Sequence, residues 1–169
     1  HGKEPDPKML RFAVEAVNRR LYLQQKDDPA LSGMGTTLTL LWAASKEVYI
    51  AQVGDSRAYL LRDGAFTQIT QDHSLVQELV NQGALTPEQA QHHPMRNVIT
   101  RAVGTDEGVE VDLFTKERRL GDIWLLCSDG LSGMVEDEDM AQILRTKAPE
   151  AAADALLQAA LDNGGRDNV

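Results

Sequence analysis

The stretch VYIAQVGDSRAYLLRDGAFTQIT, from Val48 to Thr70, consists of short apolar segments separated by turn residues. Asp63-Gly64 divides the last two segments, and this pair is typical of a hairpin turn because glycine adopts a positive φ without steric cost. The preceding segment at 36–44, TTLTLLWAA, is also rich in strand-forming residues. Together these segments predict a four-strand antiparallel meander.

An amphipathic pattern precedes the meander at residues 8–25. Apolar residues recur there three or four positions apart, with charged residues between them, so that one stripe of a helix would face a core. The residues of this stripe are Leu10, Val14, Val17 and Leu21. The pattern predicts a helix on the surface of the domain.

After the meander, the sequence predicts a helical insert, then strands, then helices. Residues 72–97 predict a helical insert, because Ser74 and Thr86 each begin a capping-box spacing. Strand character returns at 109–114 and 122–127, and helices are predicted to begin at Asp137 and Pro149. Strands and helices that are grouped in this way favour an α+β fold, an antiparallel β-sandwich covered by helices, over a doubly wound parallel sheet. With no repeat or linker, residues 1–169 predict a single domain.

Composition limits the class of protein. The net charge of −9 argues against a nucleic-acid partner, which would need clustered cations. The longest uncharged apolar run, at 37–44, is far shorter than the roughly 20 residues of a bilayer helix, so no membrane segment is expected in this chain. The single cysteine, Cys127, cannot form an internal disulfide, and this favours a cytoplasmic location.

Three aspartates stand beside a glycine at the end of a predicted strand or in a turn. They are Asp55 in VGDSR, Asp129 in CSDGL and Asp167 in GGRDNV. Any one of them could be an ordinary turn residue, since Asp and Gly are the commonest residues in turns. Three such sites together point to a centre for Mg²⁺ or Mn²⁺, which bind several carboxylate and water oxygens. Such ions would neutralise a phosphoryl group and activate water for its hydrolysis without a covalent intermediate.

Other phosphatase chemistries have less support in the sequence. A cysteine-nucleophile phosphatase needs an arginine six positions after its cysteine, and Gly133 stands six positions after Cys127. The only D-x-D pair, Asp137 and Asp139, lies in an acidic run that suits a helix N-terminus. Ser128 lacks a G-x-S-x-G elbow, so we expect it to orient its loop. Cys127 is interpreted as a core residue.

The histidines and two arginines have structural interpretations that we prefer to functional ones. His73, His92 and His93 show no metal-ligand spacing, so they are interpreted as surface or packing residues of the insert. Arg57 and Arg101 could each contact a phosphate, but a solvated or structural arginine is the more common case.

Five motifs occur in an order that resembles a known family. GMGTTLTLL, VYIAQVGDSRAYLLRDGAFTQITQDHSLVQELV, HPMRNVITRAVG, GDIWLLCSDGLSGMV and GGRDNV resemble the PPM (type 2C-like) metal-dependent protein serine/threonine phosphatases of the bacterial branch, over about residues 33–169. The resemblance implies two packed antiparallel sheets flanked by helices, an α-β-β-α arrangement. It also implies two to three Mn²⁺ or Mg²⁺ ions and hydrolysis of phosphoserine and phosphothreonine in proteins, which reverses Ser/Thr kinase signalling.

The resemblance assigns roles to the three acidic residues. Asp129 and Asp167 match ligands of the paired-metal centre, and Asp55 matches a ligand of a third metal, with Asp129 shared between the two sets. Residues 79–97 match a mobile flap beside the site. Arg101 and Asn168 match motif positions without an assigned catalytic role.

Two upstream family motifs, R-x-x-N-E-D and D-G-M-G-G, do not occur between His1 and Ser32. We therefore expect the domain to be truncated at the N-terminus and just short of its last strand, and the chain as given to be weakly active or inactive. The alternative is a catalytically silent PPM-like module for regulation or partner binding. The retained acidic residues favour the enzyme, because without metal they would repel one another. The expected partners of this monomer are phosphorylated proteins and their Ser/Thr kinases.

Overall fold

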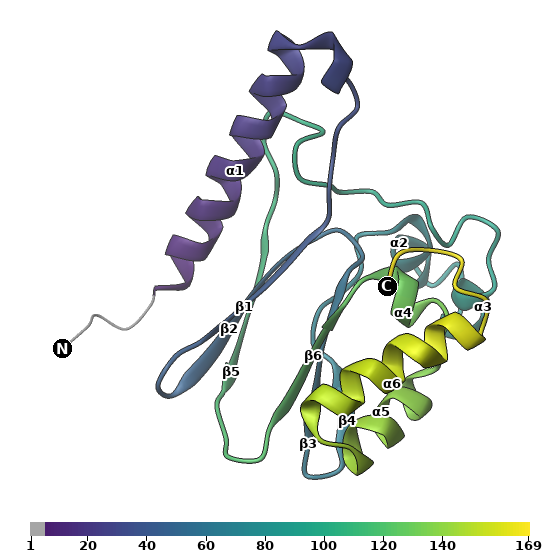
Figure 1. The fold of residues 1–169 in the computed structure, drawn as a ribbon. Coiled ribbons are helices and arrows are strands. Elements are labelled where there is room, and N and C mark those ends of the chain that lie inside the picture. The colour runs from purple at the N-terminus through teal and green to yellow at the C-terminus, as the bar shows by residue number, and fades with distance from the viewer. Residues whose placement is uncertain (1–5) are drawn as a thin grey trace. The chain divides into compact units, whose positions relative to one another are not determined.

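The computed structural model describes residues 6–169, and the chain forms two compact units. The first contains the residues up to 55 and residues 72–118, and the second contains residues 56–71 and 119–169. Each unit has its own three-stranded antiparallel sheet and its own helices (Figure 1). Among residues 6–169, none of the helices has the length and apolar character needed to cross a bilayer.

The sheet of the first unit has the order β1-β2-β5. Its strands are β1 (Leu38–Ala43), β2 (Glu47–Val53) and β5 (Asp112–Glu117), and β2 pairs antiparallel with both neighbours. The strand predicted at 109–114 therefore begins later than the sequence pattern indicates. Val111, just before β5, is buried in the core of this unit with Tyr49, Ala51 and Val53 of β2.

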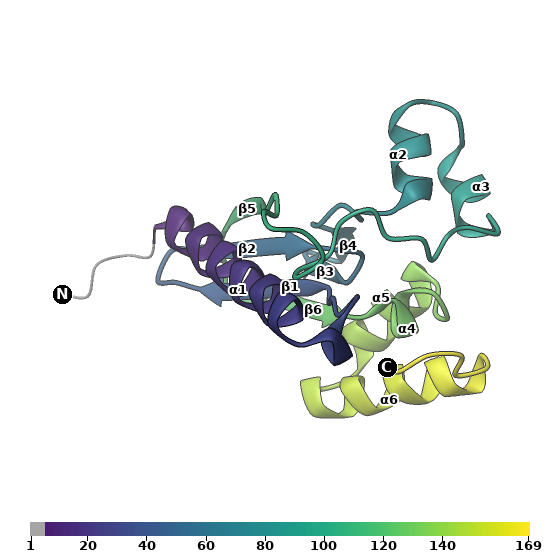
Figure 2. The ribbon, with the colours of Figure 1, turned by 90° about the horizontal axis from the view of Figure 1, so that it is seen from above.

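Helix α1 (Pro7–Asp27) runs along this sheet and contacts β2 and β5 (Figures 1 and 2). Asp6 caps it by accepting a hydrogen bond from the Lys8 amide. Leu10 and Val14 are buried as predicted, but the expectation that Val17 faces the core is wrong, because Val17 is 46% exposed. Asn18 is buried instead.

Where the sequence pattern predicts an apolar side chain, Asn18 makes three hydrogen bonds to a loop of the same unit. Its side-chain amide donates to the carbonyl oxygens of Asp106 and Glu107 at 3.0 and 3.2 Å, and its Oδ1 accepts from the Gly104 amide at 2.7 Å. A buried amide with its donors and acceptor satisfied in this way is tolerated in a core. Apolar periodicity alone could not identify it.

The helical insert is confirmed, and it consists of α2 (Leu75–Asn81) and α3 (Pro87–Gln91). Ser74 caps α2 by accepting from the Gln77 amide at 3.3 Å. Thr86 and Gln89 form a complete capping box at α3. A 3₁₀ turn, η1 (Pro29–Leu31), follows α1.

The sheet of the second unit has the order β4-β3-β6. Its strands are β3 (Arg57–Arg62), β4 (Ala65–Gln68) and β6 (Ile123–Cys127). Asp63 and Gly64 form the predicted hairpin turn, with φ of 50° and 81°. Helices α5 (Asp137–Thr146) and α6 (Pro149–Asp162) begin where the sequence predicts, and they pack against each other (Figure 1).

The predicted four-strand meander is wrong in one respect. β1 and β2 form one hairpin and β3 and β4 form another, but β2 and β3 belong to different sheets. Both edges of β2 are occupied by β1 and β5, and both edges of β3 are occupied by β4 and β6. The local pattern identifies each strand correctly, but the strands that complete each sheet come from much later in the chain.

Candidate metal centre

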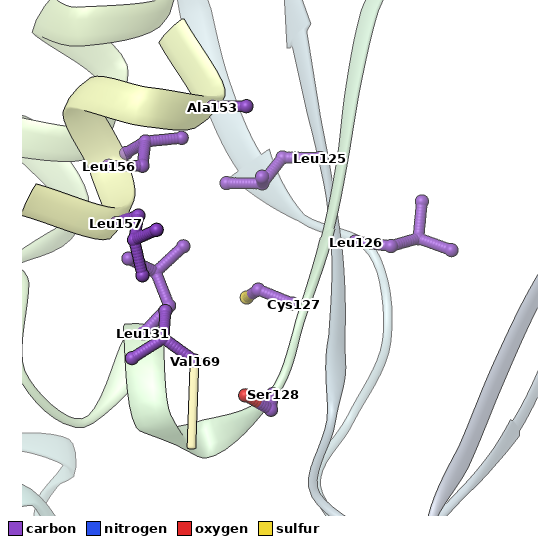
Figure 3. A pocket seen from close by; sticks show the side chains of 9 residues that line it. All are labelled: Leu125, Leu126, Cys127, Ser128, Leu131, Ala153, Leu156, Leu157 and Val169. Carbon is purple, nitrogen blue, oxygen red and sulfur yellow. The ribbon is translucent and has the colours of Figure 1, made fainter. Parts of the chain in front are cut away.

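Asp129 follows β6 directly, in the motif C-S-D-G. Within β6 the side chains alternate, so that Leu125 and Cys127 point toward α6 while Leu126 points away (Figure 3). Ser128 then ends the extended backbone, and Asp129 begins the one-turn helix α4 (Asp129–Ser132), which the sequence did not predict. The buried neighbours Gly130 and Leu131 fix this turn, and the half-buried Asp129 is held at the end of the strand.

The segment that carries Asp167 contacts the same turn. The Ser128 hydroxyl donates to the Asn168 carbonyl oxygen at 3.1 Å. Gly130 packs so closely against that carbonyl that a Cβ atom on residue 130 would overlap it. The Asn168 amide in turn donates to Oδ1 of Asp167 at 2.7 Å. The structure thus brings the SDG and RDN motifs of the second unit together, and Ser128 orients its loop as expected.

Asp55 is the last residue of the first of the two segments that make up the first unit, immediately after β2 and Gly54. Gly54 is buried with a φ of 101°, and a Cβ atom there would overlap the side chain of Thr37. Only glycine fits both conditions. The half-buried Asp55 therefore leaves the sheet through a turn with a fixed backbone.

A hydrogen-bond network around His73 holds this turn. The Gly54 amide donates to Nδ1 of His73 at 3.0 Å, and the His73 amide donates to the Gly54 carbonyl oxygen at 2.9 Å. That oxygen also accepts from the side chain of the fully buried Gln52 at 2.9 Å. His73 is only 7% exposed, so it is a packing residue rather than a surface residue.

The network continues from His73 to two charged residues. Because Nδ1 accepts the hydrogen bond from the Gly54 amide, the ring proton is assigned to Nε2, which lies 3.1 Å from Oδ2 of Asp112 and 2.9 Å from Nη1 of Arg101. Arg101 donates to the other oxygen of Asp112 at 3.0 Å and to the Glu110 carboxylate at 3.2 Å. Burial alone would raise the pKa of Asp112, but the hydrogen bonds from His73 and Arg101 lower it below its usual value. Arg101 therefore has a structural role in this unit.

Sequence reasoning did not identify His73 as part of this turn. His73 lies 19 residues after Gly54, and neither residue has a metal-ligand spacing that would single out the pair. The other histidines fit the structural interpretation: His92 is exposed, and Nδ1 of His93 accepts from the Met95 amide at 3.1 Å. The second arginine, Arg57, donates to the Tyr59 hydroxyl at 2.9 Å.

The donor chemistry of Asp129 and Asp167 fits a divalent cation, because both supply carboxylate oxygens from segments in contact. Asp55 supplies the same kind of donor from the other unit. Over residues 6–169, the structure places no group of three or more His, Cys, Asp or Glu side chains where they could hold one ion. The donor type fits Mg²⁺ or Mn²⁺, and within the second unit two of the predicted ligands have neighbouring backbones.

An apolar hollow of about 420 Å³ lies beside the SDG turn, between β6, α4 and α6 of the second unit (Figure 3). Its lining is almost entirely aliphatic: Leu125, Leu126, Cys127, Ser128, Leu131, Ala153, Leu156, Leu157 and Val169. No carboxylate is among these lining residues. The hollow is therefore unsuited to a cation, and half-buried Cys127 packs there as an apolar residue.

Comparison with known proteins agrees with the motifs. The family model described as protein phosphatase 2C matches residues 2–163. This chain belongs to the protein phosphatase 2C family. The PPM resemblance read from the sequence is thereby confirmed.

Curated bacterial relatives of this phosphatase 2C chain are longer than the chain itself. The serine/threonine protein phosphatase PstP of Mycobacterium tuberculosis is 47% identical over 160 residues, which cover 95% of this chain and 31% of PstP. The serine/threonine phosphatase stp of Listeria monocytogenes is 42% identical over 161 residues, which cover 95% of this chain and 64% of the relative. The chain thus spans about one third to two thirds of the length of these relatives.

Solved structures confirm the predicted α+β fold class. The crystal structure of the serine/threonine phosphatase Stp1 from Staphylococcus aureus matches with a TM-score of 0.90 at 42% identity. The match covers 95% of this chain and 63% of the Stp1 chain. The catalytic domain of PstP in complex with two manganese ions has a TM-score of 0.88 at 43% identity, over 98% of this chain and 70% of its own.

Proposed function

We propose that the full-length protein hydrolyses phosphoserine and phosphothreonine in other proteins with the help of bound Mn²⁺ or Mg²⁺. The observation that carries the proposal is the contact between the SDG and RDN motifs, made by Ser128 and Gly130 with the Asn168 carbonyl. Relatives and structural neighbours at 41–47% identity that are named serine/threonine or serine phosphatases support the same activity.

Asp129 and Asp167 would hold the paired ions, and Asp55 would hold a third ion, so that two to three ions are bound. When bound, such ions stabilise the charge of a phosphoryl group and activate water for its hydrolysis. The task of the chain is to hold these carboxylates in place. The end of β6 and the contact of Ser128 with Asn168 would do this for Asp129, and the Gly54 turn would do it for Asp55.

The substrates and partners belong to the same proposal. Phosphorylated proteins are the expected substrates, and Ser/Thr kinases are the expected opposing partners. We expect a monomer in the cytoplasm, the latter because the chain has one cysteine and no possible internal disulfide. The silent-module alternative is less favoured, because all three acidic residues are retained in a family whose relatives are named phosphatases.

Phosphate release from a phosphothreonine peptide by the full-length protein tests the proposal. Wild-type protein should release phosphate with Mn²⁺ or Mg²⁺ and stop after chelation. Asp129→Asn should lose at least about 100-fold in kcat/KM while retaining the fold, since a metal ligand is lost without a change in volume. Unchanged activity in this variant, or turnover that survives chelation, would contradict the proposal.

A further inference from the structure

The backbone around Gly54 is held at more points than an ordinary turn requires. Its amide donates to His73 Nδ1, and its carbonyl oxygen accepts from both the His73 amide and the Gln52 side chain. Gln52 is itself held by the Thr39 hydroxyl, which donates to its Oε1 at 2.6 Å. Every hydrogen-bonding group of Gly54 is thus engaged by a buried or half-buried partner. These bonds fix the peptide that directly precedes Asp55.

His73 is the only one of these partners that touches both sides of Gly54. Its main chain and its ring act on the carbonyl and the amide of the same residue. The opposite ring nitrogen, Nε2, lies 3.1 Å from Oδ2 of Asp112 and 2.9 Å from Nη1 of Arg101, which also donates to Oδ1 of Asp112 at 3.0 Å. Since the ring cannot rotate without breaking one of these contacts, its acceptor stays directed at the Gly54 amide.

We propose that His73 is a positioning residue that fixes the Gly54-Asp55 turn, so that Asp55 meets a divalent ion in one prepared conformation. This inference rests on the proposed role of Asp55 as a metal ligand. His73 does not bind the ion in this account. Partners of this kind, which orient a ligand without touching the metal, commonly change affinity by about 10–100-fold when they are removed.

Two substitutions separate the two ends of the imidazole. In His73→Asn the side-chain oxygen lies near the position of Nδ1, so the Gly54 amide keeps an acceptor while the link to Asp112 is lost. In His73→Gln the amide group lies near the position of Nε2, so the link to Asp112 is kept and the Gly54 amide loses its acceptor. The control is His92→Gln, the same chemical change at an exposed histidine of the insert.

The first readout needs no metal. Hydrogen exchange of the Gly54 amide in the metal-free full-length protein should be much faster in His73→Gln than in wild type. His73→Asn and His92→Gln should stay near the wild-type rate. The second readout is titration with Mn²⁺ alone, followed by electron paramagnetic resonance, to measure the ion whose binding is lost in Asp55→Asn. His73→Gln should bind that ion about 10-fold more weakly than wild type, or weaker still. His73→Asn should bind it with most of the wild-type affinity.

The results separate this inference from the proposed function, because neither readout requires a phosphorylated substrate. Wild-type Mn²⁺ affinity in His73→Gln would overturn the inference, as would a His73→Asn variant that binds as weakly as His73→Gln. An Asp55→Asn variant that loses no ion would overturn it as well. Absence of phosphatase activity in a wild-type protein that shows the expected exchange and Mn²⁺ pattern would contradict only the proposed function.

Discussion

The two turns that carry Asp55 and Asp129 have the same composition and are held by different physical means. In the first unit, hydrogen bonds from His73 and Gln52 fix the Gly54-Asp55 turn. In the second, close backbone packing of Gly130 against the Asn168 carbonyl fixes the Asp129 turn, with one hydrogen bond from Ser128. An Asp-Gly pair at the end of a strand therefore does not reveal what keeps its carboxylate in place, and the two turns should fail in different ways.

Among changes to the residues that support the two turns, the largest effect on activity is expected from Gly130→Ala. Its Cβ atom would overlap the Asn168 carbonyl, and because that neighbour is backbone, the RDN segment must move. Displacement of Asp167 should lower the phosphatase kcat/KM of the full-length protein by about 100-fold, with a weaker apparent affinity for Mn²⁺. Steady-state kinetics across a Mn²⁺ series measures both quantities.

Gly108→Ala is the matched control for this change. Gly108 has no positive φ, and among the described residues no heavy atom lies within 4 Å of a Cβ placed there. The Gly108→Ala variant should have nearly wild-type kinetics. Equal kinetics in Gly130→Ala and Gly108→Ala would show that the close contact with Asn168 does not position Asp167.

In the first unit, a substitution in the Gly54-Asp55 turn should mainly lower the stability of the fold. Gly54→Ala would place an alanine at a φ of 101° and its Cβ atom against the side chain of Thr37. Backbone strain and overpacking together should reduce the free energy of unfolding by about 2–5 kcal/mol. Denaturant unfolding of the metal-free protein measures this loss, again beside Gly108→Ala. A loss below about 1 kcal/mol would mean that the turn relaxes freely, contrary to the tight packing around it.

A smaller effect is expected from the ion pair that holds the start of β6, the strand that leads to Asp129. Both oxygens of Asp122 accept from Arg62 at 2.8 Å, and one also accepts from the Arg119 amide at 2.9 Å. The hydrogen bonds from Arg62 lower the pKa of Asp122. This stabilisation is fully present above the unfolded pKa of about 3.9 and is lost as the pH falls through the lower folded value.

Asp122→Asn should therefore cost about 1 kcal/mol at pH 6, and the difference from wild type should shrink below about pH 4. Free energies of unfolding measured from pH 6 to pH 3 check the sign. A difference that grows as the pH falls would mean that the ionised carboxylate does not stabilise the fold.

The sequence predicts the parts of this molecule that depend on local pattern. The Asp63-Gly64 hairpin, the Thr86 capping box and the helix starts at Asp137 and Pro149 all follow from neighbouring residues. The pairing of β2 with β5 and of β3 with β6 does not, because the pairs are separated by many residues and local patterns cannot choose between free edges. This is why the expected meander is divided between two sheets.

The candidate site shows the same division. The sequence singles out Asp55, Asp129 and Asp167 as candidate ligands, because acidic residues close to glycines form recognisable motifs. It does not identify the residues that hold them, since His73 and Asn168 meet their partners only in the folded chain. Helix α1 gives a similar example: Asn18 is buried and Val17 is exposed, although the apolar pattern predicts that Val17 faces the core.

The most direct test of the central claim is the number of Mn²⁺ ions bound by the full-length protein in wild type, Asp55→Asn and Asp129→Asn. The account predicts that Asp55→Asn loses one ion and keeps the pair, whereas Asp129→Asn loses tight binding of the pair, because Asp129 is proposed as one of the ligands of the pair. Equal Mn²⁺ binding by all three proteins would contradict the proposal that these two aspartates bind metal ions.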